Sequence, residues 1–356
     1  MCRLDHAAAD PLALMPVPCG SGYSQRHRQG GCPPDAREEV AVHLNEVAEG
    51  LEPLDLSQSA EFQSLLQSAR DLGIPHREGV RYVSRNTVVR HERLHFLEWG
   101  DPAAPPVLLL HGANQTSHAW DLVSLHLSDR YHVFALDHRG HGDSEWARDQ
   151  DYNSESMAAD AVAFMHQQGI VQPIIIGHSM GGRVTLRIAL DDPALARAIC
   201  FVDIAPVRSG NGGNEIREFM RRNVEFDRIE DFIERVRAYD PFRPTEHIAR
   251  TARYNLFLRA DGKYVSKSDR FLHERDQRAT PQAETITLDD VKVIDCPVLV
   301  VRGESSNILL PPEAQAFADA VQHGRMVEVA KCGHNVHTQN TPGFLDVLRP
   351  FLESIE

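Results

Sequence analysis

Short hydrophobic runs alternate with longer segments of helical spacing from about residue 78 to the C-terminus. The runs cover residues 107–110, 132–136, 174–176, 198–202, 298–301 and 326–329. Continuous apolar runs separated by helices are typical of strands that are buried on both faces of a parallel sheet. Residues 88–97 are expected to add a hairpin arm before these strands. The pattern therefore predicts an α/β fold.

The strand pattern stops between residues 207 and 287, where charged segments of helical spacing replace it. Helices are expected at residues 215–224 and 229–238. Because apolar runs return at residue 298, we interpret the interruption as a helical cap inserted between two strands of the sheet. The predicted core then has two parts, residues 78–206 and 288–356, with the cap at residues 207–287.

Residues 1–77 form an N-terminal extension to this predicted core. Residues 1–35 are rich in Pro, Gly and Ala, a composition typical of partly disordered chain. Two helical patterns follow, at residues 36–51 and 59–72. The extension carries no recognisable chemistry, and its role as a lid, a dimerisation arm or a vestigial leader stays open.

Composition and charge narrow the range of partners. The 356 residues are 42% hydrophobic and 25% charged, as in an ordinary globular protein, and the net charge of −14 disfavours nucleic acid. The apolar runs are too short to span a bilayer, and the chain start does not match an export signal. Six cysteines without CxxC pairs predict free thiols. We therefore expect a cytoplasmic protein with a small-molecule substrate and no membrane or nucleic-acid partner; a homodimer stays open.

A candidate nucleophile lies in the sequence Gly-His-Ser-Met-Gly at residues 177–181, which matches the pattern GxSxG. A predicted strand, 174–176, precedes the motif and a helical pattern follows it. A serine on such a sharp turn needs small residues two positions away on each side, and Gly177 and Gly181 meet this need. The flanking elements favour a nucleophile over a glycine-rich turn without chemistry. We interpret Ser179 as the nucleophile.

Three further landmarks accompany this motif in a characteristic order. His-Gly-Ala-Asn at residues 111–114 and Asp-His-Arg-Gly-His-Gly-Asp-Ser at residues 137–144 each follow a predicted strand, and Gly-His at residues 333–334 lies near the C-terminus. With them the chain from about residue 90 resembles the α/β-hydrolase superfamily, in the group that carries a helical cap. The resemblance implies a mostly parallel sheet flanked by helices, hydrolase chemistry and no cofactor.

The resemblance and the chemistry of acyl transfer together suggest a role for each candidate residue. Ser179 would attack the substrate, and His334 would act as its general base. The backbone amides of Ala113 and Met180 would form the oxyanion hole. His337, three residues after His334, is a weaker candidate for the base.

The acid of the expected triad is ambiguous. The family usually places it after the strand that here covers residues 298–301, where this chain has Ser306 and Asn307. Asparagine can orient a histidine, but it has no charge to stabilise the imidazolium. Asp203, after the predicted strand 198–202, is our first choice, because some members of the family place the acid after this strand. Both strands end at the same edge of the sheet, so either loop could reach the histidine. Asn307 and Glu304 stay as alternatives.

The histidines and aspartates near residue 140 could also be drawn as metal ligands. The set would comprise Asp137, His138, His141 and Asp143. A tight loop after a strand explains the same residues, with Arg139 and Asp143 holding the turn together. We therefore expect no metal.

These observations favour a serine hydrolase that cleaves a carboxylic ester or lactone through an acyl-enzyme on Ser179. Carbon–carbon bond hydrolysis and cofactor-independent dioxygenation occur on the same fold and are the enzymatic alternatives. A non-enzymatic ligand sensor is a third hypothesis, supported by the altered acid loop. Dehalogenases and epoxide hydrolases are disfavoured, because those enzymes have an aspartate in place of Ser179.

Overall fold

The computed structural model describes residues 54–207, 212–274 and 286–355. The chain divides into two compact units, Met1–Glu52 and Pro53–Glu356. All described residues belong to the second unit. The helix expected at residues 36–51 lies outside the described residues, as do three of the six cysteines.

The second unit contains a nine-stranded sheet with the order β1-β2-β3-β5-β4-β6-β7-β11-β12. Its strands are β1 (Leu54–Asp55), β2 (Tyr82–Val89), β3 (Glu92–Trp99), β4 (Pro106–Leu110), β5 (His132–Leu136), β6 (Ile174–His178), β7 (Ala198–Val202), β11 (Val298–Gly303) and β12 (Gly324–Val329). Strands β5, β4, β6, β7, β11 and β12 pair in parallel, whereas β1, β2 and β3 are antiparallel. The expected fold class, a mostly parallel α/β-hydrolase sheet, is confirmed.

The leading hairpin differs in position from the prediction. The turn between β2 and β3 falls at Arg90 and His91, both of which have positive φ. Residues 88–97, which we expected to form a hairpin arm, therefore include the end of β2, the turn and most of β3. Two-residue hairpin turns favour Asn and Gly, and the absence of both from this turn removed the signal that locates it in a sequence.

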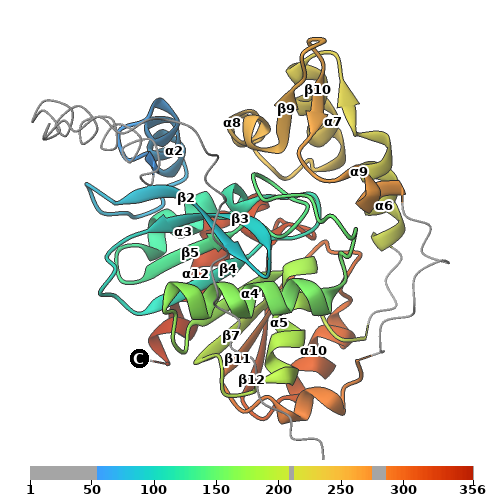
Figure 1. The fold of residues 1–356 in the computed structure, drawn as a ribbon. Helices are drawn as coiled ribbons and strands as arrows, with labels where there is room; N and C mark the ends of the chain where they lie inside the picture. The colour runs from blue at the N-terminus through green and yellow to red at the C-terminus, as the bar shows by residue number, and fades with distance from the viewer. Residues whose placement is uncertain (1–53, 208–211, 275–285, 356) are drawn as a thin grey trace, which may run out of the picture. The chain divides into compact units, whose positions relative to one another are not determined.

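Helices cover both faces of the sheet (Figure 1). One face carries α4 (Ser154–Gln168), α5 (Met180–Asp191) and α10 (Pro311–Ala320), and the other carries α2 (Ala60–Asp71), α3 (Asp121–Leu127) and α12 (Thr341–Glu353). In β4, Leu108 and Leu110 belong to the first hydrophobic core, whereas Val107 and Leu109 belong to the second. Burial on both faces explains why these strands appear in the sequence as unbroken apolar runs.

The cap lies between β7 and β11, and Figure 1 shows it in yellow and orange beside the upper edge of the sheet. It contains α6 (Gly212–Arg222), β8 (Glu225–Phe226), α7 (Ile229–Tyr239), α8 (Thr245–Asn255), β9 (Leu256–Leu258), β10 (Tyr264–Ser266) and α9 (Arg270–Glu274). Strands β8, β10 and β9 form a small antiparallel sheet that the sequence did not predict. Strands of two or three residues are too short to establish an alternating pattern.

The described part of the expected extension packs with the core and the cap. Helix α2 begins after Ser59, whose Oγ accepts the amide of Phe62 at 3.1 Å. Phe62 belongs to the same buried cluster as Trp99 of β3, and β1 pairs with β2. Arg253 of α8 forms an ion pair with Glu61 of α2 at 2.5 Å. Residues 54–77 therefore extend the sheet and support one side of the cap.

A buried carboxylate joins the antiparallel strands to the parallel ones. Glu98 of β3 has a side chain that is 4% exposed, and it accepts from Arg81 at 2.7 Å, Arg85 at 2.6 Å and His132 at 2.9 Å. Burial alone would raise the pKa of Glu98, but the hydrogen bonds from His132, Arg81 and Arg85 outweigh burial and lower the pKa well below 4.5. The ionised form is therefore the one that stabilises the fold.

Glu98→Gln is expected to lower the free energy of unfolding by about 2 kcal/mol at pH 7, because it removes a charge that accepts three hydrogen bonds. A carboxylate whose pKa is lower in the folded than in the unfolded protein stabilises the fold at pH values above its unfolded pKa. This contribution is lost as the pH falls through its folded pKa. The difference between wild type and variant should therefore shrink below about pH 4. Urea denaturation at pH 7 and pH 3.5 measures this, and a difference that is independent of pH would contradict the assignment.

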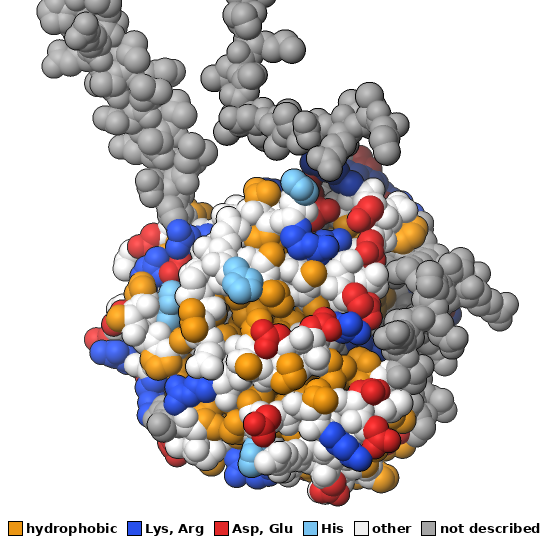
Figure 2. All heavy atoms as spheres, turned by 60° about the horizontal axis from the view of Figure 1, so that its bottom comes forward, with side chains coloured by type: hydrophobic (Ala, Val, Ile, Leu, Met, Phe, Trp, Pro, Cys, Tyr) orange, Lys and Arg blue, Asp and Glu red, His pale blue; other side chains and the backbone are white. Residues whose placement is uncertain are grey.

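The described surface shows no large field of one charge sign in the view of Figure 2, where acidic and basic side chains are interspersed with hydrophobic ones. Within the described ranges, no helix has the length and apolar character needed to cross a membrane. Cys200, Cys296 and Cys332 are free thiols, as their spacing predicted.

Candidate active site

Ser179 lies on a strained turn between β6 and α5. Its backbone has φ 49° and ψ −108°, a region that residues other than glycine rarely adopt. A Cβ at Gly181 would lie 2.2 Å from the carbonyl oxygen of Leu110, and a Cβ at Gly177 would lie 2.3 Å from Thr185 Oγ1. Only glycine fits on both sides of the serine, as the motif requires.

The structure brings Ser179, His334 and Asp203 into one hydrogen-bonded chain. His334, in the loop between β12 and α11 (Val336–Gln339), has its Nε2 2.9 Å from Ser179 Oγ. Its Nδ1 lies 2.7 Å from Oδ2 of Asp203. Asp203 follows β7 directly, is fully buried and has a φ of 52°. This geometry is that of a nucleophile, a base and an acid that orients the base.

The end of β11 and the loop that follows it supply hydrogen-bond donors to Asp203. The amide of Gly303 donates to Oδ1 at 3.0 Å, and Ser306 Oγ donates to Oδ2 at 2.5 Å. Ser306 stands in the loop where the family resemblance placed the acid. Sequence reasoning missed this role, because a serine after a strand gives no sign that it bonds a carboxylate 103 residues earlier in the chain.

The other two candidate acids lie away from the histidine ring. Asn307 is exposed, and its Nδ2 donates to Oε2 of Glu215 in α6 at 2.9 Å. Glu304 is also exposed and accepts the amide of Lys331 at 2.9 Å. Among the described residues, the carboxylate that contacts the ring of His334 is that of Asp203.

The neighbouring histidines contribute to packing and orientation. His337 is buried and stacks on Trp120, with 3.9 Å between ring centroids, and neither of its ring nitrogens has a partner in the described part of the chain. His178 Nε2 lies 3.0 Å from the carbonyl oxygen of His334. Burial, followed by the proximity of His337 and His334, lowers the pKa of His178 well below 6.5, so its ring is neutral.

Two backbone amides beside Ser179 are suited to an oxyanion. Met180 is the first residue of α5, so its amide lacks a carbonyl partner within the helix. Ala113 lines the same cavity as Ser179. Gln115 holds the loop of Ala113 in place, because its Oε1 accepts the amide of Gly112 at 3.0 Å and its Nε2 donates to Asn335 Oδ1 at 3.1 Å. A rigid donor pair is what oxyanion stabilisation requires.

A cavity with about 900 Å³ of unoccupied space, open to solvent, lies between the core and the cap at Ser179. The cap contributes an apolar wall of Phe219, Met220, Phe232, Val236, Tyr239 and Ile248. It also contributes two charged residues, Asp240 and Arg243. These cap residues lie far from Ser179 in sequence, and no local motif marks them. The mixed apolar and polar lining suits a small organic substrate.

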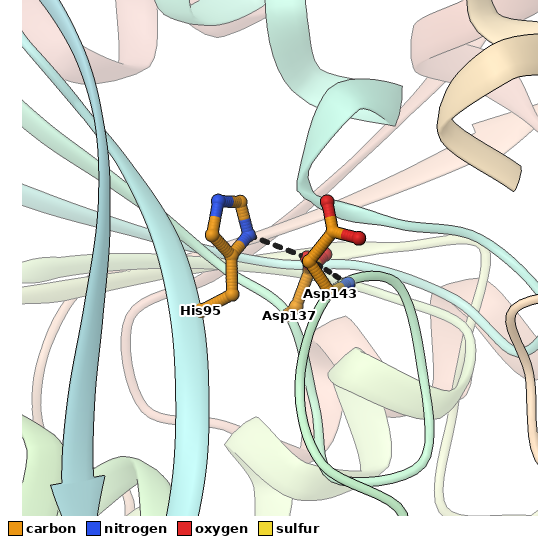
Figure 3. Close-up of side chains that lie close together, drawn as sticks. All are labelled: His95, Asp137 and Asp143. Atoms are coloured by element: carbon orange, nitrogen blue, oxygen red, sulfur yellow. Dashed lines mark hydrogen bonds and ion pairs between the residues drawn. The ribbon is translucent and has the colours of Figure 1, made fainter. Parts of the chain in front are cut away.

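His95, Asp137 and Asp143 lie close together at the loop after β5, with one potential ligand atom of each within 4.8 Å of the others (Figure 3). The oxygens of Asp137 accept from His95 Nδ1 at 2.7 Å and from the amides of Asp143 and Ser117 at 3.0 Å and 2.5 Å. Burial alone would raise the pKa of Asp137, but the hydrogen bond and charge of His95 outweigh burial and lower it. Protein donors therefore satisfy this carboxylate, which organises the turn.

The side chains of Arg139 and Asp143, which we expected to hold the turn together, bond to other elements. Arg139 instead pairs with Asp160 of α4 through two hydrogen bonds, at 2.5 Å and 2.7 Å. Asp143 pairs with Lys267 of the cap at 2.5 Å. Asp137 holds the loop together from within. The side chains of Arg139 and Asp143 connect the loop to α4 and to the cap.

Comparisons with known proteins agree with this fold. A family model described as the alpha/beta hydrolase family matches residues 107–347. An esterase of Mycobacterium tuberculosis is 25% identical, over 72% of this chain and 86% of the relative. A 3-hydroxybutyrate-oligomer hydrolase of Cupriavidus necator is 26% identical, over 71% of this chain and 89% of the relative. The crystal structure of an α/β hydrolase from Novosphingobium aromaticivorans, 26% identical, superposes with a TM-score of 0.67 over 76% of this chain and 98% of that chain.

Proposed function

We propose that this chain, which belongs to the α/β-hydrolase family, is a serine hydrolase that cleaves a carboxylic ester or lactone. The observation that carries the proposal is the hydrogen-bonded chain from Ser179 through His334 to Asp203 at a cavity that the cap and the core line together. Two relatives support it, since one is named an esterase and the other a 3-hydroxybutyrate-oligomer hydrolase.

Acylation of the enzyme follows from the contacts of His334. As Ser179 Oγ attacks the carbonyl carbon of the ester, His334 Nε2 takes the hydroxyl proton across the 2.9 Å contact. The negative charge that develops on the carbonyl oxygen meets the amides of Ala113 and Met180. Asp203 keeps the ring oriented and stabilises its positive charge. Collapse of the intermediate breaks the bond to the alcohol, which leaves with the proton from His334.

Deacylation uses the same residues in reverse. A water molecule attacks the carbonyl carbon of the acyl-enzyme while His334 Nε2 accepts one of its protons. The carbon–Oγ bond breaks, and His334 returns the proton to Ser179. The products are one carboxylic acid and one alcohol for each ester and water consumed, or a single hydroxy acid when the substrate is a lactone.

A fluorophosphonate probe tests the proposal directly. We expect one equivalent of probe on the peptide that contains Ser179, because an activated serine attacks phosphorus as it attacks carbon. Intact-protein and peptide mass spectrometry measure the label. His334→Ala should slow labelling by at least about 10²-fold, the contribution of a general base. The control His166→Ala, at an exposed position in α4, should label like wild type. Label on another residue, or equal rates in wild type and His334→Ala, would contradict the proposal.

A further inference from the structure

Arg243 lines the cavity that also contains Ser179, and the described residues leave part of the hydrogen-bonding capacity of its guanidinium unfilled. Nη2 donates to Thr251 Oγ1 at 2.6 Å. The buried Nε has no partner among the described residues. Of the nearby carboxylates, Asp121 forms an ion pair with Arg250 at 2.6 Å, and Asp240 Oδ1 accepts from Gln339 at 2.7 Å.

In this cavity, the unfilled hydrogen-bonding capacity of Arg243 is energetically unfavourable. Burial lowers the pKa of Arg243 to about 10, opposed by the charge of Asp240, so the guanidinium is still positive at neutral pH. Burial also raises the pKa of Asp240, whereas the nearby charge of Arg243 and the hydrogen bond from Gln339 lower it. A partly buried cation is usually paired with an anion that accepts its N–H groups. The ligand of this cavity is a natural source of such an anion.

The guanidinium is held in a fixed orientation before any ligand binds. The hydroxyl of Thr251 donates to the carbonyl oxygen of His247 at 2.9 Å, so its oxygen is left to accept from Arg243. A guanidinium is planar, and its parallel N–H groups can bind both oxygens of a carboxylate at once. A preoriented fork loses little conformational freedom on binding.

We propose that Arg243 binds a carboxylate carried by the substrate, and that the preferred substrates are esters with a free carboxylate, such as half-esters of short dicarboxylic acids. This inference rests on the proposed ester hydrolysis. Arg243 and Ser179 line one cavity, so a substrate that fills it can meet both residues. The carboxylate contact then acts on binding and orientation, at a distance from the bond that breaks.

Two matched pairs of esters test the inference. In the first pair the acyl chain differs, as in 4-nitrophenyl hydrogen glutarate against 4-nitrophenyl pentanoate. In the second the alcohol differs, as in the acetate ester of 4-hydroxybutanoate against butyl acetate. Wild type should favour the anionic member of at least one pair by about 30-fold or more in kcat/KM, mainly through KM. Arg243→Gln should bring that ratio close to one, and Arg243→Lys should keep part of it.

Both esters of a pair are assayed with the same protein sample. A loss of folded enzyme therefore lowers both kcat/KM values equally and leaves their ratio unchanged. The control Arg237→Gln, at an exposed position of α7, should keep the wild-type ratio. Equal turnover of both members of each pair by wild type, or a preference that survives in Arg243→Gln, would overturn the inference while leaving ester hydrolysis intact.

Calorimetry with glutarate decides the inference without turnover. Wild type should bind glutarate at least about 30-fold more tightly than Arg243→Gln. Equal or absent binding in both proteins would overturn the carboxylate site. If all four esters resist Ser179-dependent hydrolysis while glutarate binding still depends on Arg243, the proposed function fails and the anion site remains.

Discussion

Ser179→Ala is expected to lower kcat for 4-nitrophenyl esters by about 10⁵- to 10⁶-fold, the largest effect that a single substitution should have in this protein. The proposed mechanism forms its covalent intermediate on Oγ, and no other hydroxyl in the described chain accepts or donates to His334 Nε2. What remains would come from the oxyanion amides and from binding alone. Single-turnover and steady-state kinetics with 4-nitrophenyl butyrate measure the loss.

Because Ser179 lies on a strained turn, this experiment needs a control that checks whether the Ser179→Ala variant folds. Alanine at position 179 must adopt the same positive φ as serine, so the substitution adds no new backbone demand, and its melting temperature should stay close to that of wild type. Ser305→Ala, at an exposed serine in the loop after β11, should keep full activity. Oxygen-dependent substrate loss that persists in Ser179→Ala would instead indicate the dioxygenase. Ligand-induced stabilisation of wild type without turnover would indicate a sensor.

The sheet could be predicted from the sequence because its strands are buried on both faces. Residues 107–110 and 198–202 are unbroken apolar runs, and each coincides with a parallel strand in the centre of the sheet. The cap was predictable as an interruption, but its small sheet was not. The three-residue strand β10 is stabilised by pairing with β8 on one side and with β9 on the other, so the stabilising contacts are not periodic within any one segment.

The candidate site also has one part that the local sequence specifies and another that depends on contacts between distant segments. Ser179 and its two glycines are adjacent in the sequence, and the geometry of one turn specifies them. The acid is decided by which loop reaches the ring of His334, and the sequence left Asp203 and Asn307 both open. Asp203 is 131 residues from His334 in the chain, so only the parallel pairing of β7 with β11 and of β11 with β12 brings them together.

The charged residues of the cavity could not be identified from the sequence. Arg243 precedes a proline between two cap helices, in a segment with several other arginines. Its partner Thr251 lies two turns further along, in α8. Its distinguishing features are the unpaired Nε and the shared cavity with Ser179, and both depend on how the cap packs on the core.

Asp203→Asn is expected to lower kcat by about 10⁴-fold, the loss seen when the acid of a serine triad becomes an amide. The carboxylate of Asp203 accepts from three donors, namely His334, the amide of Gly303 and Ser306 Oγ. An asparagine offers one oxygen and adds an NH₂ group, which must face a donor or force the ring of His334 into the other tautomer. Steady-state kinetics give the loss, and circular dichroism checks that the buried site still folds.

The loop after β11 provides the matched controls. Asn307→Ala should change kcat by less than about twofold, since exposed side chains away from such contacts contribute little. Ser306→Ala should lower kcat by about 10-fold with KM unchanged, because one donor to the carboxylate is lost while His334 keeps its partner.

The double variant Asp203→Asn with Asn307→Asp distinguishes between the two positions for the acid. If either loop could orient the base, a carboxylate at position 307 would restore activity. The side chain of Asn307 instead points to Glu215, 2.9 Å from its Nδ2, so an aspartate there would face a like charge and gain no contact with the ring. We therefore expect the double variant to stay as impaired as Asp203→Asn alone. Recovery to within about tenfold of wild-type kcat would show that the loop moves, and that the base can be oriented from the position usual in this family.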